Sequence, residues 1–154
     1  MDLILWRHAE AESGEPDAGR KLSPKGEKQA RRMAEWLHSR LPEATRVLVS
    51  PALRAQQTAA ALATLGGRKV KTVDALAPGA SVQALLAAAD WPRAKCPVLV
   101  VGHQPVLGET AAHLLSGQLA PWAVKKGAIW WFSARDRESP GEAVLRVVMP
   151  PDLV

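Results

Sequence analysis

Residues 3–10 read LILWRHAE, four apolar residues followed at once by an arginine and a histidine. An apolar run this short is typical of a central strand, because a strand covered on both faces has no polar side to alternate with. The run therefore predicts a buried strand that delivers Arg7 and His8 at its carboxyl end. Ligands bind at that end in open α/β sheets, so both residues are candidate binding residues.

Two later apolar runs are also followed directly by polar residues. Residues 46–49 (RVLV) lead into Ser50, and residues 97–101 (PVLVV), the most apolar run of the chain, lead into a glycine and then His103. The carboxyl ends of parallel strands open at the same edge of a sheet. The sequence therefore predicts that Ser50 and His103 lie beside the end of the first strand.

The rest of the chain alternates helical and extended patterns. Further strands are predicted at 69–73, 128–133 and 143–149, and helices at 24–41, 52–65, 82–89 and from Pro105 to Gly117. Ser23, Ser50 and Ser81 precede three of these helices as capping residues. The last two strands, joined by a charged loop with Pro140 and Gly141, predict a hairpin at the sheet edge. The fold class is α/β, a three-layer α/β/α sandwich with a mostly parallel sheet and an antiparallel edge strand.

Composition narrows the class of protein. At 154 residues the chain fits one domain, expected over residues 1–154, and its single cysteine excludes an internal disulfide. No apolar run has the length of a signal peptide or a membrane span, so we expect a cytoplasmic protein with no membrane partner. We also expect a monomer. The net charge of +5 is spread out: the densest basic stretch, residues 25–32, alternates with Glu27 and Gln29. No nucleic-acid partner is expected, because the tryptophans follow strand or helix packing patterns; Trp122 is the one candidate for a partner contact.

Arginines join the predicted strand ends. Arg54 lies about one turn into the helix at 52–65, Thr58 follows one turn later, and Arg20 stands in the loop after the first strand. Thr58 is expected to steady the Arg54 guanidinium. Two or three arginines that converge on one point require a multiply charged anion with several oxygens, because their mutual repulsion is otherwise uncompensated. Phosphate fits this requirement, since a guanidinium binds two oxygens at once.

A histidine inside such a cluster can attack phosphorus. One neutral ring nitrogen has a lone pair, and a hydrogen bond from the other nitrogen to a backbone carbonyl would fix the tautomer. His8 holds this position, while Arg7, Arg54 and His103 would stabilise the charge on the transferring group. Removal of one such donor typically costs about 3 kcal/mol of transition-state stabilisation.

These segments resemble the histidine phosphatase superfamily, and within it the small SixA-type phosphohistidine phosphatases. RHAE is similar to the family's RHG signature, SPALRAQQT to its S-P-x-x-R-A-x-x-T segment and VVGHQP to its second-histidine motif; RKLSPKG, LAP and the closing MPP extend the likeness over nearly the whole chain. The resemblance implies that His8 is transiently phosphorylated, that Arg7, Arg54 and His103 hold the phosphoryl group, and that Arg20 joins them. It also implies a single histidine phosphatase domain that needs no cofactor or metal.

Two departures from the family pattern bear on the substrate. Ala9 replaces the usual glycine, which the backbone accepts if its φ is negative. Larger members that hydrolyse phosphate esters place a glutamate as leaving-group acid after the third strand, whereas VDALAPGAS here offers only Asp74, beside the strand. An alkoxide leaving group needs a proton more than the imidazole of phosphohistidine does. We therefore expect a phosphohistidine-bearing signalling or phosphotransfer protein as the substrate partner.

Other functions stay open or are set aside. A general phosphomonoesterase of the same superfamily and a non-catalytic phosphoprotein-binding domain remain as alternatives. A cysteine phosphatase is excluded, because the position six after Cys96 is Gly102 and not an arginine. A two-metal phosphoesterase would need further ligands, and the helical spacing of His38 and His113 predicts surface positions.

Overall fold

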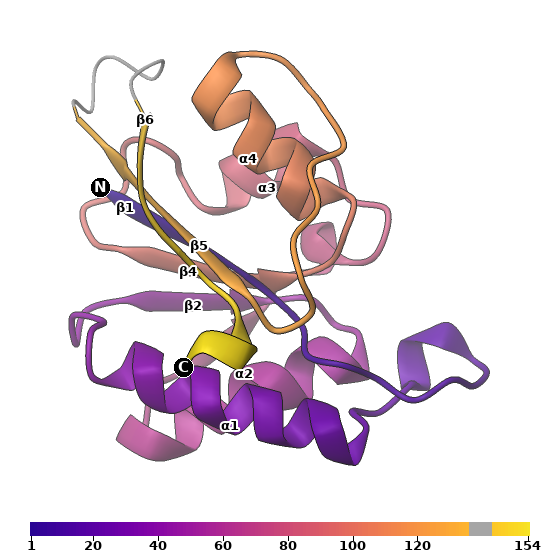
Figure 1. Ribbon diagram of the computed structural model, residues 1–154. Coiled ribbons are helices and arrows are strands. Elements are labelled where there is room, and N and C mark those ends of the chain that lie inside the picture. The colour runs from indigo at the N-terminus through magenta and orange to yellow at the C-terminus, as the bar shows by residue number, and fades with distance from the viewer. Residues whose placement is uncertain (136–142) are drawn as a thin grey trace.

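A six-stranded mixed sheet lies between two pairs of helices (Figure 1). The computed structural model describes residues 1–135 and 143–154. The strands are β1 (Asp2–Arg7), β2 (Arg46–Val49), β3 (Val70–Thr72), β4 (Val98–Gly102), β5 (Ile129–Ala134) and β6 (Ala143–Met149). The helices are α1 (Pro24–His38), α2 (Leu53–Gly66), α3 (Val82–Ala88) and α4 (Val106–Ser116), with short 3-10 helices η1 (Asp17–Gly19), η2 (Asp74–Leu76) and η3 (Pro151–Leu153).

The strand order is β3-β2-β4-β1-β5-β6, so the two runs predicted to be central are central. β1 pairs in parallel with β4, with Arg7 opposite Gly102, and β2 pairs in parallel with β4, with Val49 opposite Val101. The residues that follow these three strands therefore start from one edge of the sheet. β5 runs antiparallel to β1, and β6 pairs antiparallel with β5 as the edge strand. The mostly parallel sheet with an antiparallel edge strand is confirmed, while the predicted loop with Pro140 and Gly141 falls outside the described residues.

Each face of the sheet is covered by one helix pair. α1 and α2 cover the face to which Ile4 and Trp6 point, and α3 and α4 cover the face of Leu3 and Leu5 (Figure 1). All four side chains of this β1 run are fully buried, as its lack of alternation predicts. In the described part of the chain, no helix combines the length and the apolar character that a membrane crossing requires.

Two of the three predicted serine caps are present. The Ser23 hydroxyl accepts the Gly26 N–H at the start of α1, and the Ser81 hydroxyl accepts the Ala84 N–H at the start of α3. The prediction for Ser50 is wrong: α2 begins only at Leu53, and its capping position makes no side-chain hydrogen bond. The Ser50 hydroxyl instead accepts the N–H of Ala52, ahead of the helix, and bonds a histidine, as described below.

Gly26 holds the start of α1 against the segment that follows β1. A Cβ built at Gly26 would lie 1.9 Å from the Glu10 carbonyl oxygen, a distance that only movement of backbone could relieve. We expect Gly26→Ala to lower the free energy of unfolding by about 1–3 kcal/mol, the usual cost of overpacking. Chemical denaturation would measure it. The matched control is Gly19→Ala, because its added Cβ meets only ordinary contacts near 3.7 Å; equal stability of the two variants would contradict this packing.

Candidate active site

The ends of β1, β2 and β4 bring two histidines and a serine together. The backbone N–H of His8 donates to the Gly102 carbonyl at 3.1 Å, which fixes His8 beside the segment that leads into His103. The two imidazole centroids are 5.1 Å apart with the rings tilted by 54°. Both rings are buried, at 7% and 3% exposure. The structure therefore brings His8, Ser50 and His103 together, as the parallel strand ends predict.

The hydrogen bond of the His8 ring fixes its tautomer. Nδ1 lies 2.8 Å from the carbonyl oxygen of Ala9, and a carbonyl can only accept. Nδ1 therefore holds the proton, and Nε2 keeps its lone pair, as a nucleophile requires. Ala9 is not among the described residues with positive φ, and it is buried with Leu22 and Ala30. Its β-carbon is thus accommodated where the family has glycine.

His103 is oriented by the serine that follows β2. Its Nε2 lies 2.7 Å from the Ser50 hydroxyl, which also accepts the Ala52 N–H at 3.2 Å. With that backbone N–H as its donor, the Ser50 hydroxyl can give its own proton to Nε2, which leaves the proton of the neutral ring on Nδ1. Nδ1 is buried and has no hydrogen-bond partner among the described residues. His103 can therefore donate an N–H to a guest.

The two arginines predicted to bind the anion also keep unused donors. Arg7 donates from one terminal nitrogen to the Val124 carbonyl at 2.7 Å, and Arg54 is 5% exposed. The Nε atoms of both are buried and lack a partner among the described residues. Buried donors without partners are costly, and a polyoxygenated anion would satisfy them. Both arginines lie close enough to His8 and His103 to lower the pKa values of these histidines, so the four residues form one cluster.

Thr58 supports the site differently from the prediction. Its hydroxyl donates to the Arg54 carbonyl at 2.8 Å and accepts the Ala9 N–H at 3.1 Å. It therefore does not contact the Arg54 guanidinium, and that prediction is wrong. The hydroxyl instead ties α2 to the backbone directly after His8, so it helps to position His8.

Asp17 is a site residue that the sequence interpretation missed. Its carboxylate contacts the terminal nitrogens of Arg20 at 3.1 Å and Arg54 at 3.2 Å, and its carbonyl accepts from Arg54 at 2.9 Å. Arg20 also donates to the Glu12 carbonyl at 2.8 Å. Arg20 thus lies at the rim of the site, joined to Arg54 through Asp17. A phosphate would compete with the Asp17 carboxylate for these guanidinium groups.

The surroundings of both histidines favour their neutral forms. Burial lowers the pKa of His8 to about 4; the hydrogen bond to Ala9 opposes this shift, while Arg54, Arg7 and Arg20 add to it. Burial, reinforced by His8 and Arg54, lowers the pKa of His103 to about 3. Hydrogen bonds from Arg20 and Arg54 lower the pKa of Asp17. At neutral pH the site therefore holds two uncharged imidazoles among cations, ready to accept a dianion.

These shifts predict an unusual titration of the free protein. As pH falls through 6.5, the ordinary value, we expect the ring signals of His8 and His103 to stay those of neutral imidazoles until about pH 5 or below. NMR of the histidine rings, assigned with single-histidine variants, would measure this. Titration of either ring near 6.5 would contradict the burial and charge argument.

Other predicted features have plain places in the fold. His38 and His113 are exposed on helices, as predicted, and Asp74 is exposed in η2. Trp122 packs against the core, with its ring centroid 6.2 Å from that of Trp130. This favours a packing role for Trp122 over contact with a partner. Within residues 1–135 and 143–154, no group of three or more His, Cys, Asp or Glu side chains is placed to hold a metal ion.

Sequence comparisons show which family the chain resembles. A family model of the histidine phosphatase superfamily (branch 1) matches residues 3–77. The phosphohistidine phosphatase SixA of Escherichia coli K12 is 33% identical over 129 residues, which cover 79% of this chain and 78% of SixA. An uncharacterized protein of Picosynechococcus sp. is 38% identical over 124 residues, 77% of this chain and 75% of that protein.

Solved structures extend the likeness to the whole fold. The protein histidine phosphatase SixA, solved in complex with tungstate, is similar with a TM-score of 0.81 and 29% identity over 99% of both chains. A mycobacterial glucosyl-3-phosphoglycerate phosphatase shares the fold, with a TM-score of 0.73 and 21% identity over 95% of this chain and 97% of its own. Fold and sequence place the protein among the phosphatases. The chain belongs to the histidine phosphatase superfamily.

Proposed function

We propose that the protein removes the phosphoryl group from phosphohistidine on a signalling or phosphotransfer protein, through a covalent phospho-His8 intermediate and without a metal ion. One observation supports this most directly: His8, whose Nε2 is left unprotonated, lies in a cluster with Arg7, Arg54 and His103, each of which keeps an unused donor. The similarity to SixA, a phosphohistidine phosphatase, supports the substrate class.

The first half-reaction transfers the phosphoryl group to His8. The lone pair of Nε2 forms a bond to phosphorus while the P–N bond of the substrate breaks, and the substrate imidazole leaves with that electron pair. The Nδ1–H of His8 keeps its hydrogen bond to the Ala9 carbonyl, and this bond stabilises the positive charge that the ring gains. Arg7, Arg54 and His103 contribute N–H groups to the equatorial oxygens. These donors are fixed before the reaction, so little reorganisation is required.

The second half-reaction hydrolyses phospho-His8. Water attacks phosphorus, the P–Nε2 bond breaks, and inorganic phosphate leaves as His8 recovers its lone pair. The attacking water releases a proton to solvent or to the phosphate itself. The Asp17 carboxylate then displaces the phosphate, because it competes with phosphate for Arg54 and Arg20.

The chemistry of the leaving group favours a phosphoramidate, such as phosphohistidine, over a phosphate ester as the substrate. An alkoxide must be protonated as it departs, whereas imidazole is a much better leaving group. Asp17 has a lowered pKa because Arg20 and Arg54 hydrogen-bond to its ionised form, so it is a poor proton donor at neutral pH. Of the carboxylates in the described residues, Asp17 is the one that forms ion pairs with Arg20 and Arg54.

Substrate comparison tests the proposal. We expect the enzyme to hydrolyse a histidine-phosphorylated protein with a kcat/KM at least about 100-fold above that for the alkyl esters phosphoserine and glycerol phosphate, because imidazole needs less help to leave than an alkoxide. Phosphate release would be measured with and without excess EDTA, and EDTA is expected to have no effect. Faster turnover of the esters would overturn the substrate class, and loss of activity in EDTA would overturn metal independence.

A further inference from the structure

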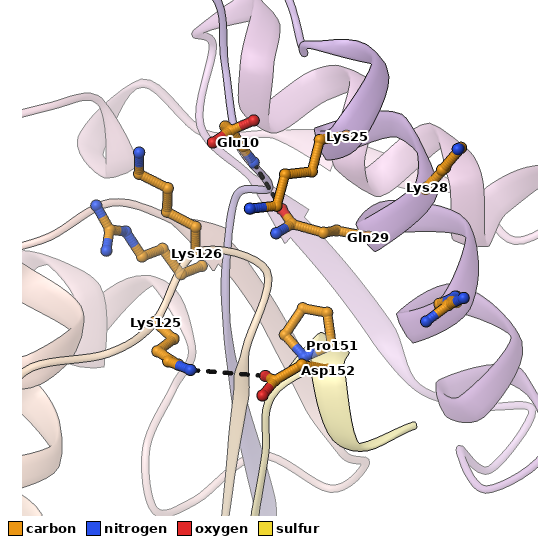
Figure 2. Close-up of a pocket in the computed structure, with 10 residues that line it drawn as sticks. Glu10, Lys25, Lys28, Gln29, Lys125, Lys126, Pro151 and Asp152 are labelled. Carbon is orange, nitrogen blue, oxygen red and sulfur yellow. Dashed lines mark hydrogen bonds and ion pairs between the residues drawn. The ribbon is translucent and has the colours of Figure 1, made fainter.

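A basic groove of about 680 Å³ opens beside the candidate active site. Figure 2 shows Lys25 and Gln29 extending from α1 on one side, Lys125 and Lys126 from the segment before β5 on the other, and Pro151 and Asp152 of η3 at one end. The groove borders the candidate active site, because Arg7 belongs to both. A phosphoryl group alone would leave nearly all of it empty, since drug-sized ligands fill pockets of about 300–1,000 Å³.

The groove has a large excess of positive charge. Its lining cations are Arg7, Lys25, Lys28, Arg32, Lys125 and Lys126. Against these six stand two carboxylates, an excess of four. Glu10 accepts a hydrogen bond from Ser23 at 2.8 Å, and Asp152 lies 3.6 Å from Lys125 in an exposed pair that contributes little. Lys25, Lys28, Arg32 and Lys126 form no ion pair with the described residues.

The wall that holds Lys125 and Lys126 is anchored to the end of β1. The Arg7 guanidinium donates to the Val124 carbonyl, and the Gly127 N–H donates to the carbonyls of Arg7 and His8, each at 3.1 Å. Gly127 has a φ of 76°, and a Cβ there would approach the Pro151 ring to 2.8 Å. Backbone contacts therefore hold this wall in place, while the lysine side chains remain exposed.

We propose that this groove docks an acidic segment of the phosphoprotein, next to the phosphohistidine whose phosphoryl group enters the active site. Except for Arg7 and Arg32, the cations are exposed lysines, flexible point charges that suit spread-out carboxylates on a protein surface. Rim charges of this kind chiefly raise association rates and select partners. The proposal rests on the proposed function, which supplies the phosphohistidine.

The test uses two synthetic peptides with one phosphohistidine each, flanked on both sides by glutamates in one and by glutamines in the other. We expect a kcat/KM roughly tenfold higher for the glutamate peptide at low salt, and a preference that fades as salt screens the charges. In Lys25→Glu/Lys125→Glu/Lys126→Glu the preference should disappear. The matched control, Lys69→Glu/Lys71→Glu/Lys95→Glu, changes the net charge equally at exposed positions outside the groove lining and should keep it.

Hydrolysis of phosphoramidate, which is too small to reach the groove, reports on the chemical step and should be equal in all three proteins. Equal rates on the two peptides, or a preference that survives in the groove variant, would overturn the docking proposal. Binding of tripolyphosphate and of the glutamate peptide would be compared between the wild type and the groove variant. If the variant lost binding of tripolyphosphate but not of the glutamate peptide, the docking proposal would also be overturned. If neither phosphoramidate nor either peptide is hydrolysed, the proposed function itself fails, a result distinct from loss of the preference alone.

Discussion

Replacing His8 by asparagine is expected to lower kcat on a phosphohistidine substrate by about 10⁴-fold or more, because the nucleophile is removed. Asparagine can keep a hydrogen bond to the Ala9 carbonyl, the contact that Nδ1 makes at 2.8 Å. The side chain would therefore stay in place without a lone-pair nitrogen that can be phosphorylated. Phosphate release under single-turnover conditions would measure the loss.

The controls for this variant separate chemistry from folding. His113→Asn changes an exposed histidine on α4 and should leave kcat unchanged. Tungstate binding should persist in His8→Asn, since Arg7, Arg54 and His103 remain. A His8→Asn enzyme that keeps about a tenth of the wild-type rate would contradict the role of His8 as nucleophile, because loss of a nucleophile costs far more.

Arg54→Lys is expected to lower kcat/KM by about 100- to 1,000-fold although the positive charge is kept. The guanidinium of Arg54 reaches the carbonyl and the carboxylate of Asp17 with two nitrogens and keeps a buried Nε without a partner among the described residues. A lysine ammonium is a single donor centre and cannot cover these directions at once. Steady-state kinetics, with tungstate inhibition as a second readout, would measure the change.

Arg31→Lys, the same substitution at an exposed position of α1, serves as the matched control and should have no effect. The thermal midpoint of both variants would be recorded, because a lysine at a position that is 5% exposed could also affect folding. A kcat/KM within about threefold of wild type for Arg54→Lys would show that the fork geometry is not required.

Much of the fold could be predicted because strands buried on both faces appear in the sequence as short runs of apolar residues. The runs at residues 3–6 and 97–101 have no polar alternation, and both became central strands covered on two faces. Ser23 and Ser81 capped helices as expected, because each hydroxyl accepts the backbone N–H three residues later; Ser23 does so while donating to Glu10. The neighbourhood of His8 and His103 followed from parallel pairing alone, since Arg7 stands opposite Gly102.

The errors all concern polar side chains with a choice of partners. Ser50 has the same serine-proline signal as Ser23, yet its hydroxyl bonds His103, which lies 53 positions away. Thr58 faces Arg54 on the helix, but a threonine in a helix can donate to the carbonyl four residues earlier, and here it does. Asp17 had no local signal, because its contact with Arg54 spans 37 positions. Helical spacing and capping rules consider only residues close in sequence, so they cannot predict contacts with partners this far along the chain.

Trapping the phosphorylated enzyme tests the central claim most directly. Wild-type protein would be quenched at alkaline pH within the first turnovers of a phosphohistidine substrate, digested without acid, and analysed by mass spectrometry. We predict acid-labile phosphate on the peptide that contains His8, and none there in His8→Asn. Turnover by wild-type protein with no phosphate on His8, or with phosphate on another residue, would contradict covalent catalysis by His8.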